Sequence, residues 1–158
     1  MMKILAMDTS NKALSLAILE NKETLGQVTL NIKKNHSITL MPAIDFLMNS
    51  LDLKPADLDR IAVAQGPGSY TGLRIAVATA KTLAHTLKIE LVGVSSLQAL
   101  IPEQVEGLII PVMDARRNNV YAGFYQSGQA VRPEAHLPLA EVLEIAGAAN
   151  QPVTFVGE

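Results

Sequence analysis

Three short hydrophobic runs near the start of the chain are separated by polar turns, and this pattern predicts three β-strands. The first run is apolar up to Asp8, and the other two alternate with a period of two. Only short polar turns separate the runs. Because connections this short join neighbouring antiparallel strands, the sequence predicts an antiparallel meander over residues 3–8, 13–20 and 24–32.

After the meander, the hydrophobic spacing indicates two helices alternating with two buried strands. The helix expected over residues 36–51 is apolar on more than one face, and the helix expected over 72–87 has Lys81 as its only fixed charge between Arg74 and Lys88. Both helices are therefore expected to be covered on two sides. The run at 61–65 is too apolar for an edge strand and is predicted as a buried, parallel one, and the run at 89–94 is predicted as another buried strand.

The pattern of the first residues then returns. MDTSNKALSLAILE at 7–20 and MDARRNNVYAGFYQ at 113–126 both read strand, Asp, polar turn, strand, which makes Asp8 and Asp114 equivalent. We expect strands at 108–114, 120–126, 129–132 and 152–157, and a helix at 138–149. The chain is accordingly predicted to form a first lobe over 1–101 and the start of a related lobe over 102–158, which lacks counterparts of the last elements of the first.

Composition narrows the function classes. The 158 residues include 13 basic and 15 acidic side chains, so the net charge of -2 gives no general attraction to nucleic acid or anionic membrane. The absence of cysteine excludes disulfides and thiolate metal sites. The start of the chain has no apolar segment of signal-peptide length, and no run of about 18 apolar residues occurs. We expect a cytoplasmic protein without membrane contact.

The glycine-rich stretch GPGSYTGLR, at residues 66–74, joins a predicted strand to a predicted helix. Such a turn can hold phosphate on backbone N–H groups at a helix N-terminus. Its glycine spacing, however, is one residue longer than the dinucleotide fingerprint, and it lacks the Gly-Lys-Ser/Thr of a P-loop. The spacing favours a tight corner, with Gly68 at positive φ and Ser69 or Thr71 as the N-cap.

Two polar turns are further candidates for phosphate binding. Asp8, Thr9 and Ser10 follow the first strand and are equally compatible with a phosphate and Mg²⁺ site or with an ordinary turn. Arg116 and Arg117 follow Asp114 in the second lobe. Paired arginines can bind a phosphate or a carboxylate, although a solvated turn is the more common case.

The histidines do not indicate metal or hydrolytic chemistry. His36, His85 and His136 share no metal-ligand spacing such as HxxxH, and the chain has no GxSxG. We therefore expect neither a metal site nor a catalytic triad in this chain.

Taken together, five segments resemble one family. They are ILAMDTS near the start, NHSITLMP at 35–42, GPGSYTGLRI at 66–75, VGVSSLQAL at 92–100 and MDARRNNVY at 113–121. In this order they resemble the TsaB (YeaZ) family of bacterial tRNA threonylcarbamoyladenosine synthesis, within the actin/Hsp70/sugar-kinase superfamily. The resemblance implies an α/β fold with an actin-like (ribonuclease H-like) first lobe and a mixed sheet.

The resemblance also implies a function. TsaB-like proteins are non-catalytic dimerisation subunits that pair with a TsaD-like catalytic subunit, and a TsaE-like ATPase joins them. The complex transfers a threonylcarbamoyl group to the adenosine next to the anticodon of tRNA. ATP and metal are then expected in the partner subunits, and no cofactor is required by this chain. TsaD-like proteins carry a metal-binding HxxxH where this sequence reads SSLQAL at 95–100.

The resemblance assigns roles to particular residues. The two predicted helices are expected to form a four-helix bundle with those of the partner, through Ile38, Met41, Met48, Arg74, Ala76, Thr79 and Leu83. A nucleotide site bordered by the glycine-rich turn stays open as an alternative, with Asp8, Thr9, Gly66 and Gly68 as its residues. Two other functions also stay open: a small-molecule ATP-dependent kinase of the same superfamily, and a free-standing homodimeric interaction module.

Overall fold

A computed structural model describes residues 1–32 and 35–157. The chain divides into two compact units, Met1–Ser96 and Leu97–Glu158. The sequence placed the division between lobes after residue 101, so residues 97–101 are grouped with the second unit instead of the first.

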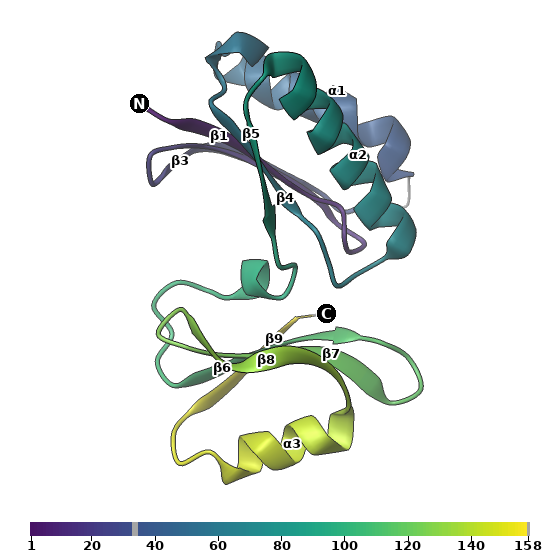
Figure 1. Cartoon of the computed structure of the whole chain (residues 1–158), viewed down its shortest axis with the longest axis vertical. Coiled ribbons are helices and arrows are strands. Elements are labelled where there is room, and N and C mark those ends of the chain that lie inside the picture. The colour runs from purple at the N-terminus through teal and green to yellow at the C-terminus, as the bar shows by residue number, and fades with distance from the viewer. Residues whose placement is uncertain (33–34, 158) are drawn as a thin grey trace. The chain divides into compact units, whose positions relative to one another are not determined.

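The first unit contains a five-stranded mixed sheet in the order β3-β2-β1-β4-β5 (Figure 1). β1, β2 and β3 pair antiparallel, whereas β4 runs parallel to β1 and β5 runs parallel to β4. The predicted meander is confirmed, and β4 and β5 are parallel strands as expected. β4 is largely buried, but β5 lies at the edge of the sheet and none of its five residues is buried, so the prediction of a second buried strand was wrong. The strands are β1 (Lys3–Asp8), β2 (Leu14–Glu20), β3 (Glu23–Leu30), β4 (Arg60–Ala64) and β5 (Glu90–Val94).

Two helices, α1 (His36–Ser50) and α2 (Tyr70–Leu87), cover one face of this sheet (Figure 1). The Asn35 side chain caps α1 by accepting a hydrogen bond from Ser37 N, and Ser69 caps α2 by accepting one from Gly72 N. Side chains from α1, α2 and the strands form one core, and each large side chain fully buried there stabilises the unit by about 1.5–3 kcal/mol. Short 3₁₀-helices lie at Pro55–Asp57 and, in the second unit, Gln98–Leu100.

The second unit contains a four-stranded sheet in the order β8-β7-β6-β9 and one helix, α3 (Leu139–Ala148). Its strands are β6 (Leu108–Asp114), β7 (Asn119–Gln126), β8 (Gln129–Pro138) and β9 (Val153–Gly157). A strand begins at residue 129 as predicted, but β8 has ten residues, so the predicted end near residue 132 was wrong. Most of β8 is exposed and its pairing with β7 shifts register, so no alternation of buried and polar residues marks its length in the sequence.

The two units repeat one topology. In both, an antiparallel meander is followed by a helix and then by a strand that runs parallel to the first. The Asp that ends the first strand accepts the same backbone hydrogen bond in each. Asp8 Oδ1 accepts a hydrogen bond from Ser10 N, Asp114 Oδ1 accepts one from Arg116 N, and both distances are 2.8 Å. Asp8 and Asp114 thus occupy equivalent positions in the two units, as the sequence predicted.

Candidate functional site

The glycine-rich corner between β4 and α2 is tied to two other segments of the first unit. Gly66 N donates to Ser96 Oγ at 3.1 Å, and Ser96 N donates to Gly66 O at 2.8 Å. Ser69 N donates to Ser10 O at 2.8 Å, which links the corner to the turn between β1 and β2. The Gly66–Pro67 peptide bond is cis.

The glycines of this corner allow backbone to pack against backbone. A Cβ added to Gly68 would lie 2.6 Å from Ser10 O, and one added to Gly72 would lie 2.0 Å from Thr9 O. Gly68 also has the positive φ predicted for it, and Ser69 is the N-cap. The spacing of the glycines is therefore explained by close contact with the DTS turn, as the interpretation of a tight corner requires.

The polar groups of the DTS turn are engaged within the fold. Thr9 is fully buried, and its Oγ1 donates to Gly72 O at 2.5 Å. Asp8 Oδ1 accepts hydrogen bonds from both the N–H and the hydroxyl of Ser10, at 2.8 and 2.5 Å. The structure thus brings Asp8, Thr9 and the glycine-rich corner together. A cofactor role for Asp8, Thr9, Gly66 and Gly68 stays a prediction.

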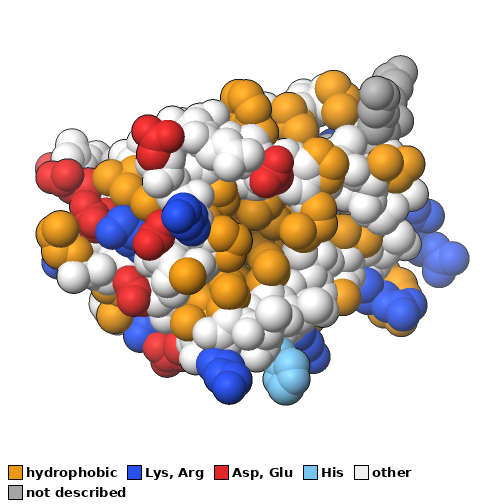
Figure 2. All heavy atoms as spheres, turned by 90° about the horizontal axis from the view of Figure 1, so that it is seen from above, with side chains coloured by type: hydrophobic (Ala, Val, Ile, Leu, Met, Phe, Trp, Pro, Cys, Tyr) orange, Lys and Arg blue, Asp and Glu red, His pale blue; other side chains and the backbone are white. Residues whose placement is uncertain are grey.

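The other candidate site is an apolar surface on α1 and α2. Ile38 is 70% exposed, Met41 49% and Phe46 63%, all on α1. Seen from above in Figure 2, hydrophobic side chains form a band across this part of the molecule, and most of the charged side chains lie toward its margins. A groove in this region is lined from α1 by Met41, Ile44, Asp45, Met48 and Asn49, and from α2 by Leu83 and Leu87.

The predicted partner residues divide into two groups. Ile38, Met41 and Arg74 are exposed, and Thr79 and Leu83 are partly exposed. Met48 (4% exposed) and Ala76 (0%) are instead buried in the first unit, although Met48 also lines the groove, and a contact of either residue with a partner stays a prediction. Ala76 belongs to a stripe of small residues, with Gly72, Ala80 and Ala84, that is buried along α2.

Two exposed aromatic residues were missed in the prediction. Phe46 lies on the exposed side of α1, and Tyr70 begins α2. The guanidinium of Arg74 lies 5.5 Å from the centroid of the Tyr70 ring, in a cation–π contact across one helical turn. The signal for Phe46 was available, because this large apolar residue lies outside the stripe formed by Leu40, Ile44 and Leu47.

The histidine on α1 has a contact within the fold. His36 Nε2 lies 3.1 Å from Asn11 O, at the β1–β2 turn. Among residues 1–32 and 35–157, no three His, Cys, Asp or Glu side chains form a cluster that could hold a metal ion. In the same residues, no helix is long and apolar enough to cross a membrane.

Comparison with known proteins identifies the family of this chain. Residues 17–157 match the family model TsaD, tRNA N6-adenosine threonylcarbamoyltransferase. The tRNA threonylcarbamoyladenosine biosynthesis protein TsaB of Bacillus subtilis (strain 168) is 46% identical over 99% of this chain and 71% of that protein. The chain belongs to the TsaB family. The Escherichia coli (strain K12) TsaB is 30% identical over 79% of this chain and 55% of its own length.

Solved structures of TsaB-family proteins agree with the fold. YeaZ from Pseudomonas aeruginosa has a TM-score of 0.78 and 34% identity over 87% of this chain and 68% of its own. Another structure, of an uncharacterized protein with similarity to peptidase YeaZ from P. aeruginosa, has a TM-score of 0.83 and 28% identity. It covers 100% of this chain and 84% of that chain. The predicted actin-like α/β fold with mixed sheets is confirmed.

Proposed function

We propose that this TsaB-family chain acts in tRNA threonylcarbamoyladenosine biosynthesis as a non-catalytic subunit. It pairs through α1 and α2 with the TsaD-like protein of the same cell, and a TsaE-like ATPase joins the pair in the cytoplasm. The complex transfers the threonylcarbamoyl group to the adenosine next to the anticodon. The observation that carries this proposal is the exposed apolar surface of α1 and α2 in a chain of this family.

The chemistry of this surface supports a protein partner. Large apolar side chains gathered on one exposed face are unusual for a monomer and typical of an interface. The charges around them are sparse and divided by sign: α1 has Asp45 as its one acidic residue, and α2 carries Arg74 and Lys81 but no acid. A partner with apolar helices of its own would bury Ile38, Met41 and Phe46 without desolvating many charges.

The glycine-rich corner supports a structural role within this function. The hydroxyl of Thr9 and one carboxylate oxygen of Asp8 already have hydrogen-bond partners in the fold. Their part in the proposal is to hold the start of α2 against the β1–β2 turn, which fixes the direction of the helix that carries half of the partner surface. ATP and metal are assigned to the partner subunits.

A reconstituted modification reaction tests this function. The chain, the TsaD-like and TsaE-like proteins of the same organism, ATP, the threonylcarbamoyl precursor and unmodified tRNA are incubated together, and the modified nucleoside is measured by mass spectrometry. We expect product only when the chain is present. Product formed at an equal rate without the chain would contradict the proposal, as would product formed by the chain without the TsaD-like protein.

Self-association is a second candidate that the same surface favours. If this apolar face fits the helices of a TsaD-like protein with a related fold, it can also fit the same helices of a second copy of this chain. To distinguish self-association from pairing with the TsaD-like protein, the molar mass of the chain is measured alone and in the presence of that protein. A homodimer that persists unchanged in the mixture would favour the free-standing interaction module.

A further inference from the structure

The turn between β6 and β7 presents two neighbouring arginines. Arg116 and Arg117 are both exposed, and together with Asn118 they have positive φ angles of 65°, 53° and 60°. Three consecutive left-handed residues without a glycine are strained, because glycine is the residue that adopts this conformation without steric cost. Because strained residues are concentrated at functional sites, this turn is a candidate for a functional role.

Hydrogen bonds hold this turn in a defined shape. Asp114 Oδ1 accepts from Arg116 N at 2.8 Å, and Ala115 N donates to Asn119 O at 2.9 Å. Asn119 N donates to Arg116 O at 3.0 Å, and Leu139 N, at the start of α3, donates to Asn118 O at 2.8 Å. The backbone that carries the two guanidinium groups is thus ordered before any ligand arrives, which lowers the entropy lost on binding.

The equivalent turn of the first unit is built differently. There the strand partners are Asp8 and Ser15, seven residues apart, whereas Asp114 and Val120 are six apart. The longer turn has no left-handed residue between positions 9 and 14, and its Thr9 and Ser10 are buried against the glycine-rich corner. The repeat therefore contains one turn that is packed into the fold and one turn that offers arginines to solvent.

The two guanidinium groups have no ion pair within the part of the chain that the structure describes. Its ion pairs there are Lys3–Glu20 and Arg60–Glu90, both in the first unit. Two acidic side chains of the second unit make other contacts. One carboxylate oxygen of Asp114 accepts a hydrogen bond from the backbone of the turn, and Glu134 accepts one from the Tyr125 hydroxyl. Glu141 lies in the first turn of α3.

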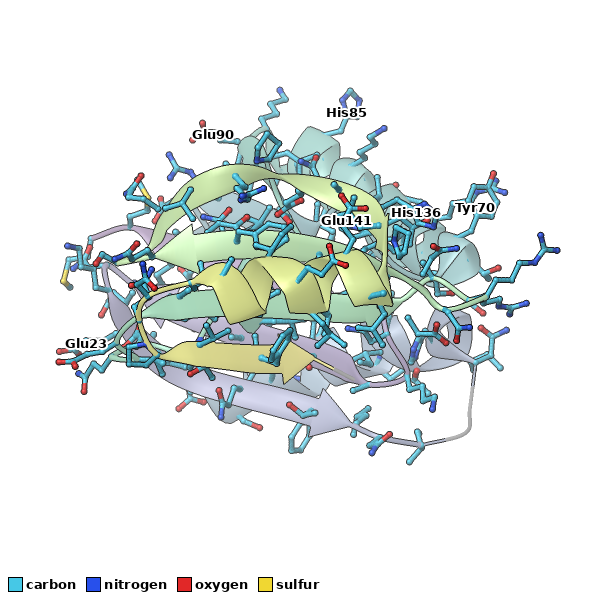
Figure 3. All side chains as sticks on the ribbon, turned by 90° about the horizontal axis from the view of Figure 1, so that it is seen from below. Glu23, Tyr70, His85, Glu90, His136 and Glu141 are labelled. Carbon is cyan, nitrogen blue, oxygen red and sulfur yellow. The ribbon has the colours of Figure 1, made fainter. Side chains whose placement is uncertain are left out.

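An aromatic pair lies close to this turn along the sheet. Tyr121 on β7 and His136 on β8 are cross-strand partners, with ring centroids 5.3 Å apart and planes inclined by 53°. Val120 and Ala122 face the core under α3, so Tyr121 and His136 lie on the opposite face of the sheet. Figure 3 labels His136 toward the end of the sheet where β8 leads into α3, with Glu141 on the helix itself.

We propose that this end of the second unit binds RNA. The guanidinium groups of Arg116 and Arg117 contact backbone phosphates, for which their planar donors are suited, and the Tyr121–His136 pair stacks on an unpaired base. Exposed aromatic rings beside arginines are the usual means of holding single-stranded nucleotides. The proposal rests on the proposed function, which makes tRNA the substrate of the complex. It adds that this subunit itself contacts the tRNA.

RNA titrations of the assembled complex test this site. Fluorescence anisotropy is measured for an anticodon stem-loop of the substrate tRNA, with the double variant Arg116→Gln/Arg117→Gln and with Arg132→Gln as the control. Arg132 is the matched control because it lies over Phe124, on the α3 side of the sheet. We expect the double variant to bind the stem-loop about tenfold more weakly. The slope of log K against the logarithm of the salt concentration should become less steep by about 2, whereas the control should keep the affinity and the slope of the wild type.

The aromatic pair has its own signature in the same assay. Tyr121→Ala is expected to weaken binding of the stem-loop several-fold while the salt slope stays as in the wild type, because stacking releases no counterions. Size-exclusion chromatography of each variant with the TsaD-like protein is run first, so that loss of assembly is distinguished from loss of RNA binding.

Unchanged RNA affinity and salt slope in the double variant would overturn the proposal and leave the proposed function intact. Weaker assembly with unchanged RNA affinity would also overturn it, and would assign the arginines to an acidic protein surface. If the proposed function itself fails because no complex forms, the same titrations on the chain alone apply the same criteria to the arginine turn.

Discussion

Gly72 shows how one residue links sequence to architecture. Its position in the first turn of α2 looks unfavourable for a helix, since glycine lowers helix propensity. The close contact of position 72 with Thr9 O explains why glycine occurs there, because no side chain fits between α2 and the DTS turn. Close packing against the DTS turn thus accounts for Gly68 and Gly72 of the glycine-rich stretch.

Replacement of Gly72 by alanine tests the packing directly. Its Cβ would meet a backbone oxygen that cannot move aside, so we expect Gly72→Ala to lower the free energy of unfolding by about 3 kcal/mol, as overpacked cores do. Gly147→Ala is the control, because a Cβ there meets no atom within 4 Å. Urea denaturation followed by circular dichroism measures both variants. An equal stability of Gly72→Ala and the wild type would show that the corner is loosely packed.

At the scale of elements, α2 shows what the sequence could predict and what it could not. The helix itself followed from hydrophobic periodicity, whereas a cover on its second side stays a prediction. The distinction between core and partner surface did not follow from periodicity, because alanine occurs on both. Ala76 was assigned to the partner surface, whereas α2 lies so close to the sheet that small residues form its buried stripe.

Arginine substitutions distinguish the buried stripe of α2 from the exposed surface of α1. Ala76→Arg places a charge in the core and is expected to unfold the first unit or to lower its stability by more than 3 kcal/mol. Ile38→Arg lies on the exposed surface of α1 and is expected to change stability by less than about 0.5 kcal/mol. Thermal melts of the two purified variants make the comparison. A stable, folded Ala76→Arg protein would place α2 further from the sheet.

Other elements show the same limit of sequence patterns. β4 and β5 were predicted as strands because their residues are almost all apolar, but only β4 is largely buried, since β5 forms the edge of the sheet. The length of β8 was missed because exposed edge strands need no apolar alternation, and Pro133 within it favours a shorter strand. The aromatic pair of Tyr121 and His136 depends on the register of β7 and β8, which the sequence did not specify.

For the whole molecule, the repeat accounts for a division of roles between two related units. The first unit offers an apolar helical surface, and the second offers the arginine turn and an aromatic pair at one end of its sheet. In a TsaB-family chain, these features support one account: a subunit whose helices bind the catalytic partner and whose second unit contributes to holding the tRNA. The central claim of this account is the pairing through α1 and α2.

The most direct test is the mass of the mixed proteins. The chain is combined with the TsaD-like protein of the same organism, and size-exclusion chromatography with light scattering is run for the wild type, Phe46→Arg and the control Leu143→Arg. Leu143 is a comparably exposed apolar residue on α3. We predict a 1:1 heterodimer for the wild type and the control, and a dissociation constant raised at least tenfold for Phe46→Arg. A heterodimer that forms equally well with Phe46→Arg, or fails with Leu143→Arg, would contradict the account.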